Sequence, residues 1–201
     1  MVHHNSYLAL GDSYTIGESV PLHESFPYQT VQLLRKQKLH FHAPEIVAKT
    51  GWTSFELAEH LLHTELNEQY DFVSLLIGVN NQYRGLTQKD FRTDLEFLLH
   101  KALHLSGLRP ERVILLSIPD WGCTPFAKDR DTAAISEEID TFNKCCANEA
   151  RKNKVHFVNI TEVTRTYKNN LQAMSPDLLH YSGMIHAIWA ESVAEIMMAQ
   201  L

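Results

Sequence analysis

A serine, an aspartate and a histidine in this chain are the residue types of a nucleophilic acyl-transfer centre. Ser13 follows a short apolar run, so its hydroxyl is expected just past the end of a strand, where open parallel sheets face a ligand. A serine hydroxyl is a weak nucleophile until a base removes its proton, and His180 suits that task near neutral pH. Asp177, three positions before His180, is expected to orient the imidazole.

Attack on an acyl carbonyl creates an oxyanion, which needs hydrogen-bond donors that are already fixed in place. The candidate donors are the backbone N–H of Ser13, the backbone N–H of Gly51 and the side-chain amide of Asn80. Gly51 and Asn80 follow the second and third expected strands, and glycine permits close approach of the backbone. A helix beginning after Ser13 would add its positive dipole end to the same place.

The elements that must position these residues alternate between strands and helices. The expected strands are 6–10, a stretch within 41–48, 72–77, 113–117 and 155–159. Most are apolar on both faces, as buried parallel strands are. Apolar residues recur at helical spacing in three stripes: Phe91, Leu95, Leu98, Ala102 and Leu105; Ile135, Ile139, Phe142, Cys146 and Ala150; and Ile185, Trp189, Val193 and Ile196. The pattern predicts an α/β fold in which helices cover both faces of a parallel sheet, as a single domain over 1–201.

Four short blocks occur in order along the chain. They are Gly11-Asp12-Ser13-Tyr14, the lone Gly51, Gly78-Val79-Asn80-Asn81, and Asp177 to His180. Together, at expected strand ends, they resemble the SGNH hydrolase superfamily, also called the GDSL esterases and lipases. The resemblance implies a three-layer α/β/α fold with a flavodoxin-like, mostly five-stranded parallel sheet. It also implies serine hydrolysis of esters or thioesters without a metal or an organic cofactor.

The resemblance assigns a role to each matching residue. Ser13 would be the nucleophile and first oxyanion donor, Gly51 and Asn80 the other donors, His180 the general base and acid, and Asp177 its orienting partner. Four positions depart from common family residues: Tyr14 for Leu, Asn81 for Asp, and Leu178 and Tyr181 where Gly and Pro are frequent. None removes a catalytic group, but Asn81 changes the hydrogen bonding because an amide donates as well as accepts.

Other catalytic classes lack their signatures. The order Ser, Asp, His is that of α/β-hydrolases, but the G-x-S-x-G elbow is absent. The histidine pairs 60/63 and 100/104 have metal-compatible spacing, yet neither has an obvious third ligand and HExxH is missing, so solvated helix faces are favoured. No Gly-rich phosphate loop occurs, which argues against a nucleotide cofactor.

Composition narrows the partners and the compartment. The formal net charge of −6, without a basic run, argues against a nucleic-acid partner. The longest apolar stretch, 72–79, is too short to span a bilayer, and residues 1–6 lack the features of a secretory signal. Three cysteines in an irregular arrangement suit a reducing compartment, so the cytoplasm is expected. The sequence leaves the oligomeric state open.

The substrate is less sharply predicted than the reaction. Trp52, Tyr83, Arg84 and Trp121 follow the expected strands and are candidates to line the crevice. An apolar wall would suit an acyl chain, and Arg84 would suit an anionic leaving group, as in a lysophospholipid or a thioester. An acetylated sugar is an alternative, because sugars stack on Trp. A non-catalytic ligand-binding protein on the same fold is the alternative from another class.

Overall fold

Five short strands form one parallel sheet in the computed structural model, which describes residues 3–168 and 170–201. The strands are β1 (Tyr7–Gly11), β2 (Glu45–Ala48), β3 (Phe72–Leu76), β4 (Val113–Leu116) and β5 (His156–Val158). Their order is β2-β1-β3-β4-β5, and every neighbouring pair is parallel. Every residue of β1, β3 and β4 is buried, which explains why these strands are apolar on both faces.

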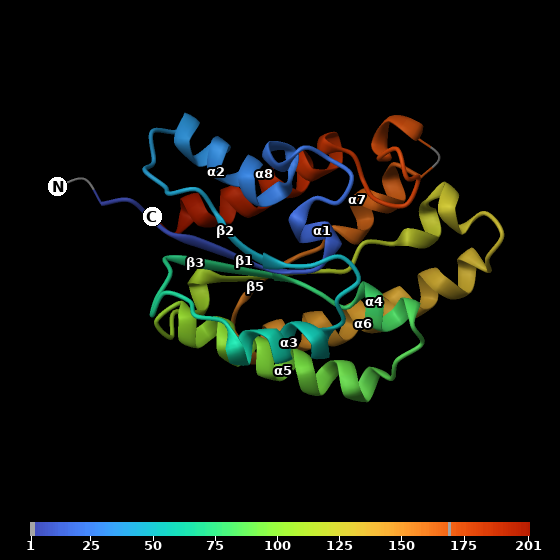
Figure 1. Cartoon of the computed structure of the whole chain (residues 1–201), viewed down its shortest axis with the longest axis horizontal. Coiled ribbons are helices and arrows are strands. Elements are labelled where there is room, and N and C mark those ends of the chain that lie inside the picture. Colours follow the sequence, from blue (N-terminus) through green and yellow to red (C-terminus); the bar gives the residue numbers. More distant parts are fainter. Residues whose placement is uncertain (1–2, 169) are drawn as a thin grey trace.

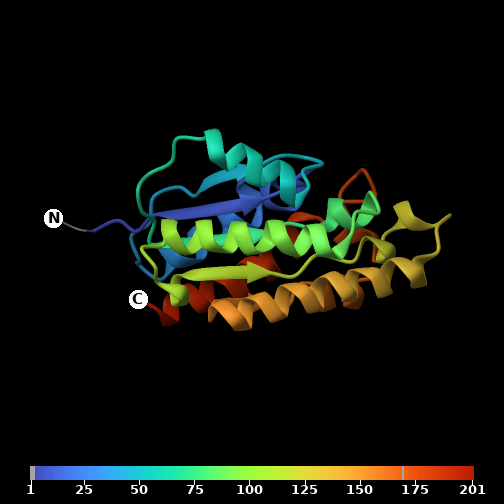
Figure 2. The ribbon, with the colours of Figure 1, turned by 90° about the horizontal axis from the view of Figure 1, so that it is seen from below.

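Helices cover both faces of this sheet (Figure 1). The longer helices are α2 (Phe26–Lys36) and α8 (Gly183–Ala199) on one face, and α3 (Ser54–His63), α5 (Gln88–Leu105) and α6 (Thr132–Asn153) on the other. Figure 2 shows α5 and α6 running side by side. The short helices are α1 (Ser13–Ile16), α4 (Val79–Tyr83) and α7 (Thr161–Thr166), with single 3-10 turns η1 (Leu22–Glu24), η2 (Pro110–Arg112), η3 (Trp121–Cys123), η4 (Pro125–Ala127) and η5 (Leu171–Ala173). The predicted three-layer α/β/α fold is confirmed.

The apolar stripes predicted from helical spacing lie in the core. All five stripe residues of α5 and all five of α6 are buried, as are Ile185, Trp189 and Val193 of α8, whereas Ile196 is half-buried. Cys146 belongs to the α6 stripe and is fully buried. It therefore packs as a small apolar side chain, as its position on the stripe predicts.

The strand order places the ends of β1 and β3 beside each other. The chain adds β2 on one side of β1 and then β3 on the other side, so the winding direction reverses at the β1/β3 pair. In open α/β sheets, the ligand crevice forms at this reversal, outside the carboxyl ends of the strands. Ser13 follows β1 and Asn80 follows β3, so the topology brings two of the four sequence blocks to one edge.

Candidate active site

Ser13 is the first residue of α1, directly beyond the end of β1. The side chain of Asp12 caps this helix, accepting a hydrogen bond from the Tyr14 N–H at 3.0 Å. Asp12 is fully buried, and burial raises the pKa of its carboxyl to about 7, against the lowering effect of the bond from Tyr14. Its place in the structure is that of a helix cap. Within the described residues the Ser13 N–H has no protein acceptor.

Asp177 and His180 are joined by a short hydrogen bond. Nδ1 of His180 lies 2.6 Å from Oδ2 of Asp177, and Oδ2 also accepts a bond from the Ser19 hydroxyl at 2.8 Å. Oδ1 accepts the backbone N–H groups of Leu179 and His180. Burial opposes ionisation of Asp177, but these four bonds outweigh it and hold the pKa of the carboxyl well below its usual range. An ionised carboxylate can only accept, so Nδ1 carries the hydrogen and Nε2 is left as a proton acceptor.

Ser13 and His180 line the same cavity, which has a volume of about 160 Å³. Both residues are buried, with 4% and 8% of their surfaces exposed. Within the described residues no hydrogen bond joins the Ser13 hydroxyl to His180. Catalytic hydrogen bonds of this kind commonly tighten only in the complex with substrate. The other lining residues are Tyr14, Val79, Asn80, Tyr83, Trp121, Phe126 and Leu179.

The two remaining oxyanion candidates lie on two segments that bond to each other. Gly51 lies in the loop 49–53 between β2 and α3, which we call the Gly51 loop, and Asn80 lies on the short helix α4. Nδ2 of Asn80 donates to the carbonyl oxygen of Trp52 at 2.9 Å, which leaves its second amide hydrogen free. Gly51 has a φ of +83°, a conformation that favours glycine, and its carbonyl accepts a bond from Arg84. In the described part of the chain the Gly51 N–H has no protein acceptor. The Gly51 loop is thus fixed to α4 while its N–H stays available.

The four candidate substrate-contacting residues fall into two pairs. Tyr83 and Trp121 line the cavity, with their rings edge to face at a centroid distance of 5.2 Å. Trp52 and Arg84 are not among the lining residues. Trp52 packs against the ring of His60, and Arg84 pairs with Glu56 and the Gly51 carbonyl. In this structure Trp52 and Arg84 brace the Gly51 loop.

Comparisons with known proteins agree with this geometry. The sequence model of the GDSL-like lipase/acylhydrolase family matches residues 9–188. The chain belongs to this family. It is accordingly an ester-hydrolysing serine hydrolase. A search of curated proteins by sequence found no match.

Three solved structures share the fold. An acetylxylan esterase, Axe2 from Geobacillus stearothermophilus, superposes with a TM-score of 0.77 at 17% identity, covering 98% of this chain and 95% of that one. A lipase/acylhydrolase from Enterococcus faecalis gives 0.76 at 20% identity, covering 98% and 97%. TesA gives 0.75 at 16% identity, covering 98% and 99%. At these identities the likeness concerns the fold.

A second histidine lies near the site of this GDSL-like hydrolase and was not singled out from the sequence. His186 is buried in α8, where its Nδ1 accepts the backbone N–H of Phe26 at 3.2 Å and its ring packs against Trp189. Burial, with a smaller effect from His180, lowers its pKa to about 3. The sequence signal for a buried histidine was its position three residues before Trp189, on the apolar face of α8. We conclude that His186 is a neutral structural residue.

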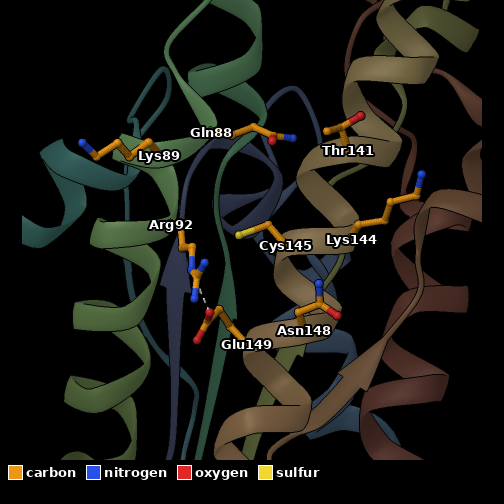
Figure 3. Close-up of a pocket in the computed structure, with 8 residues that line it drawn as sticks. All are labelled: Gln88, Lys89, Arg92, Thr141, Lys144, Cys145, Asn148 and Glu149. Carbon is orange, nitrogen blue, oxygen red and sulfur yellow. Dashed lines mark hydrogen bonds and ion pairs between the residues drawn. The ribbon is translucent and has the colours of Figure 1, made fainter.

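A hollow of about 540 Å³ between α5 and α6 contains none of the candidate catalytic residues. Figure 3 shows Arg92 and Glu149 facing each other, with the Cys145 sulfur directed between the helices. Nε of Arg92 lies 3.1 Å from Oε1 of Glu149. Burial and the Glu149 carboxylate raise the pKa of the Cys145 thiol. A raised pKa lowers the fraction of thiolate near neutral pH, so the Cys145 thiol is a poor nucleophile.

The described residues 3–168 and 170–201 contain no group of three or more His, Cys, Asp or Glu side chains placed to hold a metal ion. The pairs His60/His63 and His100/His104 therefore stay without a third ligand in this range. None of the helices in this range has the length and apolar character needed to cross a bilayer.

Proposed function

We propose that this GDSL-like hydrolase cleaves short-chain carboxylic esters through an acyl-enzyme, with Ser13, His180 and Asp177 as its catalytic triad. One observation carries the proposal. Ser13, Asn80 and His180 line a single cavity, and Nδ1 of His180 is hydrogen-bonded to Asp177. A nucleophile, a base with a fixed tautomer and an oxyanion donor are the parts that acyl transfer requires.

In the acylation half, the Ser13 oxygen attacks the ester carbonyl carbon as its proton passes to Nε2 of His180. The Asp177 carboxylate stabilises the imidazolium that forms, without itself becoming protonated. When the tetrahedral intermediate collapses, the bond to the leaving oxygen breaks and His180 returns the proton to that oxygen. The alcohol leaves, and the acyl group remains as an ester of Ser13.

Deacylation repeats the sequence with water as the nucleophile. His180 accepts a proton from water, the hydroxide attacks the acyl carbon, and the Ser13 oxygen departs with the proton from His180. In both halves the charge on the carbonyl oxygen is stabilised by the N–H groups of Ser13 and Gly51 and the free amide hydrogen of Asn80. Each such donor is typically worth a factor of about 10² to 10³ in kcat.

The size of the cavity favours a short acyl group. Its volume of about 160 Å³ is small beside the roughly 300 Å³ or more of pockets that hold drug-sized ligands. Much of its wall is apolar, from Val79, Phe126, Leu179 and the rings of Tyr83 and Trp121. We therefore place the acyl chain here, with acyl groups from acetyl to butyryl preferred over long fatty acyl groups.

A neighbouring hollow of about 450 Å³ is a candidate location for the leaving group. It shares Tyr83 and Trp121 with the smaller cavity, and its other lining residues include Arg130, Asp131 and Glu138. These charged side chains can bond the hydroxyls of a sugar-like alcohol, and the two rings give it an apolar surface to pack on. This lining favours a carbohydrate O-acetyl ester as the second candidate substrate, beside simple short-chain esters and thioesters. A ligand-binding protein without turnover is the competing class.

Hydrolysis of p-nitrophenyl esters from acetate to dodecanoate, by the wild-type protein and by Ser13→Ala, tests the proposal. We expect turnover that is lost in Ser13→Ala and that is greatest for the short acyl groups. If the protein is an enzyme, Ser13→Ala should lose turnover but still bind the substrate, because the variant keeps the cavity. A binding protein would show no turnover before or after the substitution. Turnover that survives Ser13→Ala, or that peaks at dodecanoate, would contradict the nucleophile or the acyl site respectively.

We further propose that the enzyme works in the cytoplasm on a small-molecule substrate. The three cysteines, Cys123, Cys145 and Cys146, are free thiols, and free thiols persist in reducing compartments. Measurement of their redox state in protein isolated under acid quench tests this assignment. Oxidised cysteines would contradict it.

A further inference from the structure

Asn81 follows the candidate oxyanion residue Asn80 and is itself buried, with 1% of its surface exposed. Its Oδ1 accepts the backbone N–H of Ser54 at 2.9 Å, and its Nδ2 donates to the Ser54 hydroxyl oxygen at 2.7 Å. The Ser54 hydroxyl lies 2.7 Å from Oδ2 of Asp94 on α5. Asn81, Ser54 and Asp94 therefore form a continuous chain of hydrogen bonds, which we call the Asn81 relay.

The direction of every bond in the Asn81 relay follows from its ends. The Ser54 N–H can only donate, so the amide atom facing it must be the oxygen of Asn81. The Asn81 nitrogen then faces the Ser54 hydroxyl and can only donate to it. The single Ser54 hydroxyl hydrogen is left for Asp94, which as a carboxylate can only accept. All three bonds are satisfied in this one arrangement.

The Asn81 relay joins the two segments that carry the candidate oxyanion donors, the Gly51 loop with the start of α3 and the helix α4. Ser54 is the first residue of α3, three positions after Gly51, and Asn81 is the neighbour of Asn80 on α4. A parallel bond joins Asn80 to the Trp52 carbonyl. Consecutive asparagines thus hold the Gly51 loop at two points, which fixes the separation between the Gly51 N–H and the Asn80 amide.

An aspartate at position 81, frequent in the family, does not fit this chain. A carboxylate there accepts the Ser54 N–H but has no hydrogen for the Ser54 hydroxyl. Two carboxylates, at positions 81 and 94, would then compete for one hydroxyl hydrogen beside the fully buried Ser54. Buried charges without partners are costly. The amide of Asn81 is the neutral group that donates and accepts at the required places.

We propose that Asn81 is a positioning residue of the oxyanion site. It acts through Ser54, to which both ends of its amide are bonded, and Asp94 takes the hydrogen of the Ser54 hydroxyl. The inference rests on the proposed oxyanion roles of Gly51 and Asn80. Asn81 does not line the cavity, so it acts by fixing the position of the Gly51 loop relative to α4. Because the Asp94 carboxylate takes the Ser54 hydroxyl hydrogen, the side chain at position 81 must be one that donates to the Ser54 hydroxyl oxygen.

Other charged groups around the relay are already paired. Glu56 on α3 accepts the Thr53 N–H and hydroxyl and pairs with Arg84, and its pKa is lowered by these bonds against a smaller desolvation effect. Glu138 on α6 accepts a bond from Gln82. Asp94 is therefore the carboxylate that a charge at position 81 would oppose within the relay, and neutralising Asp94 is the specific compensation for such a charge.

The test compares Asn81→Asp with Asn81→Asp/Asp94→Asn in the hydrolysis of p-nitrophenyl acetate. We expect Asn81→Asp to lower kcat by about 10-fold to 100-fold at about pH 8, with KM little changed, because the donors act mainly on the transition state. The ratio of variant to wild-type kcat should rise as the pH falls, because a protonated carboxyl regains a hydrogen to donate. The double variant should recover most of the loss.

Asn81→Asp/Glu59→Gln is the matched control, because Glu59 is an exposed carboxylate on α3 and the net charge equals that of the first double variant. It should show no recovery. Wild-type kcat in Asn81→Asp, or a loss that neither lower pH nor Asp94→Asn relieves, would overturn the inference. If Asn81→Asp does not fold, Ser54→Ala replaces it, with an expected fall in kcat of about 3-fold to 10-fold; wild-type kcat there would overturn the inference.

Ser13→Ala in the same assay separates the two proposals. If its activity is lost while the relay variants behave as wild type, the proposed function stands and the Asn81 inference fails. If its activity persists, the proposed function fails, and the Asn81 inference fails with it.

Discussion

The carboxylate of Asp177 holds His180 at two points. Oδ2 lies 2.6 Å from the ring nitrogen Nδ1, and Oδ1 accepts the backbone N–H of the same histidine at 2.9 Å. The ring and the backbone of one residue are thus fixed by one side chain, three positions earlier in the sequence. This arrangement leaves the imidazole little rotational freedom and keeps Nε2 available for the proposed proton transfer with Ser13.

Replacement of Asp177 tests this pair. In Asp177→Asn the side chain is no longer an anion that stabilises the imidazolium, and its amide favours the wrong tautomer. We expect kcat to fall by about 10³ or more, with little change in KM. Asp129→Asn is the control, because Asp129 is exposed and lies outside the cavity. A fall of less than about tenfold in Asp177→Asn would exclude the proposed role of this carboxylate.

Acid sensitivity of the fold is expected from His186. Its pKa is about 3 in the folded protein against 6.5 in the reference state, so between these values the unfolded chain binds the proton more readily. Stability from His186 is therefore full above about pH 6.5 and falls as the pH is lowered toward 3, by at most about 1.4 kcal/mol per pH unit. Asp12, whose pKa is raised from 3.8 to about 7, changes stability in the opposite direction.

The variant His186→Asn isolates the contribution of His186. The Asn side-chain oxygen can still accept the Phe26 N–H but does not titrate. We expect lower stability at neutral pH, because packing against Trp189 is lost, together with a smaller loss between about pH 7 and about pH 5 than in the wild type. Denaturant unfolding at both pH values measures this. Equal pH dependence in the two proteins would refute the assignment.

Leu178 is expected to tolerate glycine better than valine. It has a φ of +60° within the turn that carries Asp177 and His180, and its side chain is exposed by 44%. A β-branched residue is strained in this conformation. We expect Leu178→Val to lose about 1 to 2 kcal/mol of stability and to lower kcat, while Leu178→Gly stays within about 1 kcal/mol of the wild type.

Leu171→Val provides the comparison for Leu178→Val. Leu171 is also an exposed leucine, and it does not have a positive φ. Thermal unfolding of the four variants and the wild type, including Leu171→Gly, separates loss of the side chain from backbone strain. A Leu178→Val variant as stable as Leu171→Val would show that the turn relaxes without cost.

Tyr83 is expected to limit the length of the acyl group. Its side chain is 49% exposed, and its ring lies against Trp121 in the cavity wall. Tyr83→Ala should open the cavity toward the neighbouring hollow and move the preferred p-nitrophenyl ester to a longer acyl chain. Phe55→Ala removes an exposed aromatic ring outside the cavity and should leave the preference unchanged. An unaltered preference in Tyr83→Ala would place the acyl chain elsewhere.

Local features of the sequence predicted the fold closely. The expected strand 72–77 corresponds to β3 (Phe72–Leu76), and the strand expected over 6–10 corresponds to β1 (Tyr7–Gly11), shifted by one residue. These strands are predictable because a strand that is buried on both faces must be apolar along its whole length, and a few consecutive residues are enough to recognise this pattern. Strand ends are less sharp, since the last pairings depend on the neighbouring strand.

The sequence by itself determined the alternating α/β pattern, the apolar faces and the order of the four blocks, because each depends on residues close together in the chain. Only the tertiary structure decided which side chains meet. Tyr83 lines the cavity while the adjacent Arg84 braces Gly51, and Asn81 reaches Ser54 and Asp94. Such contacts depend on strand order and on helix packing between distant segments. The hydrophobic periodicity of the sequence does not encode them.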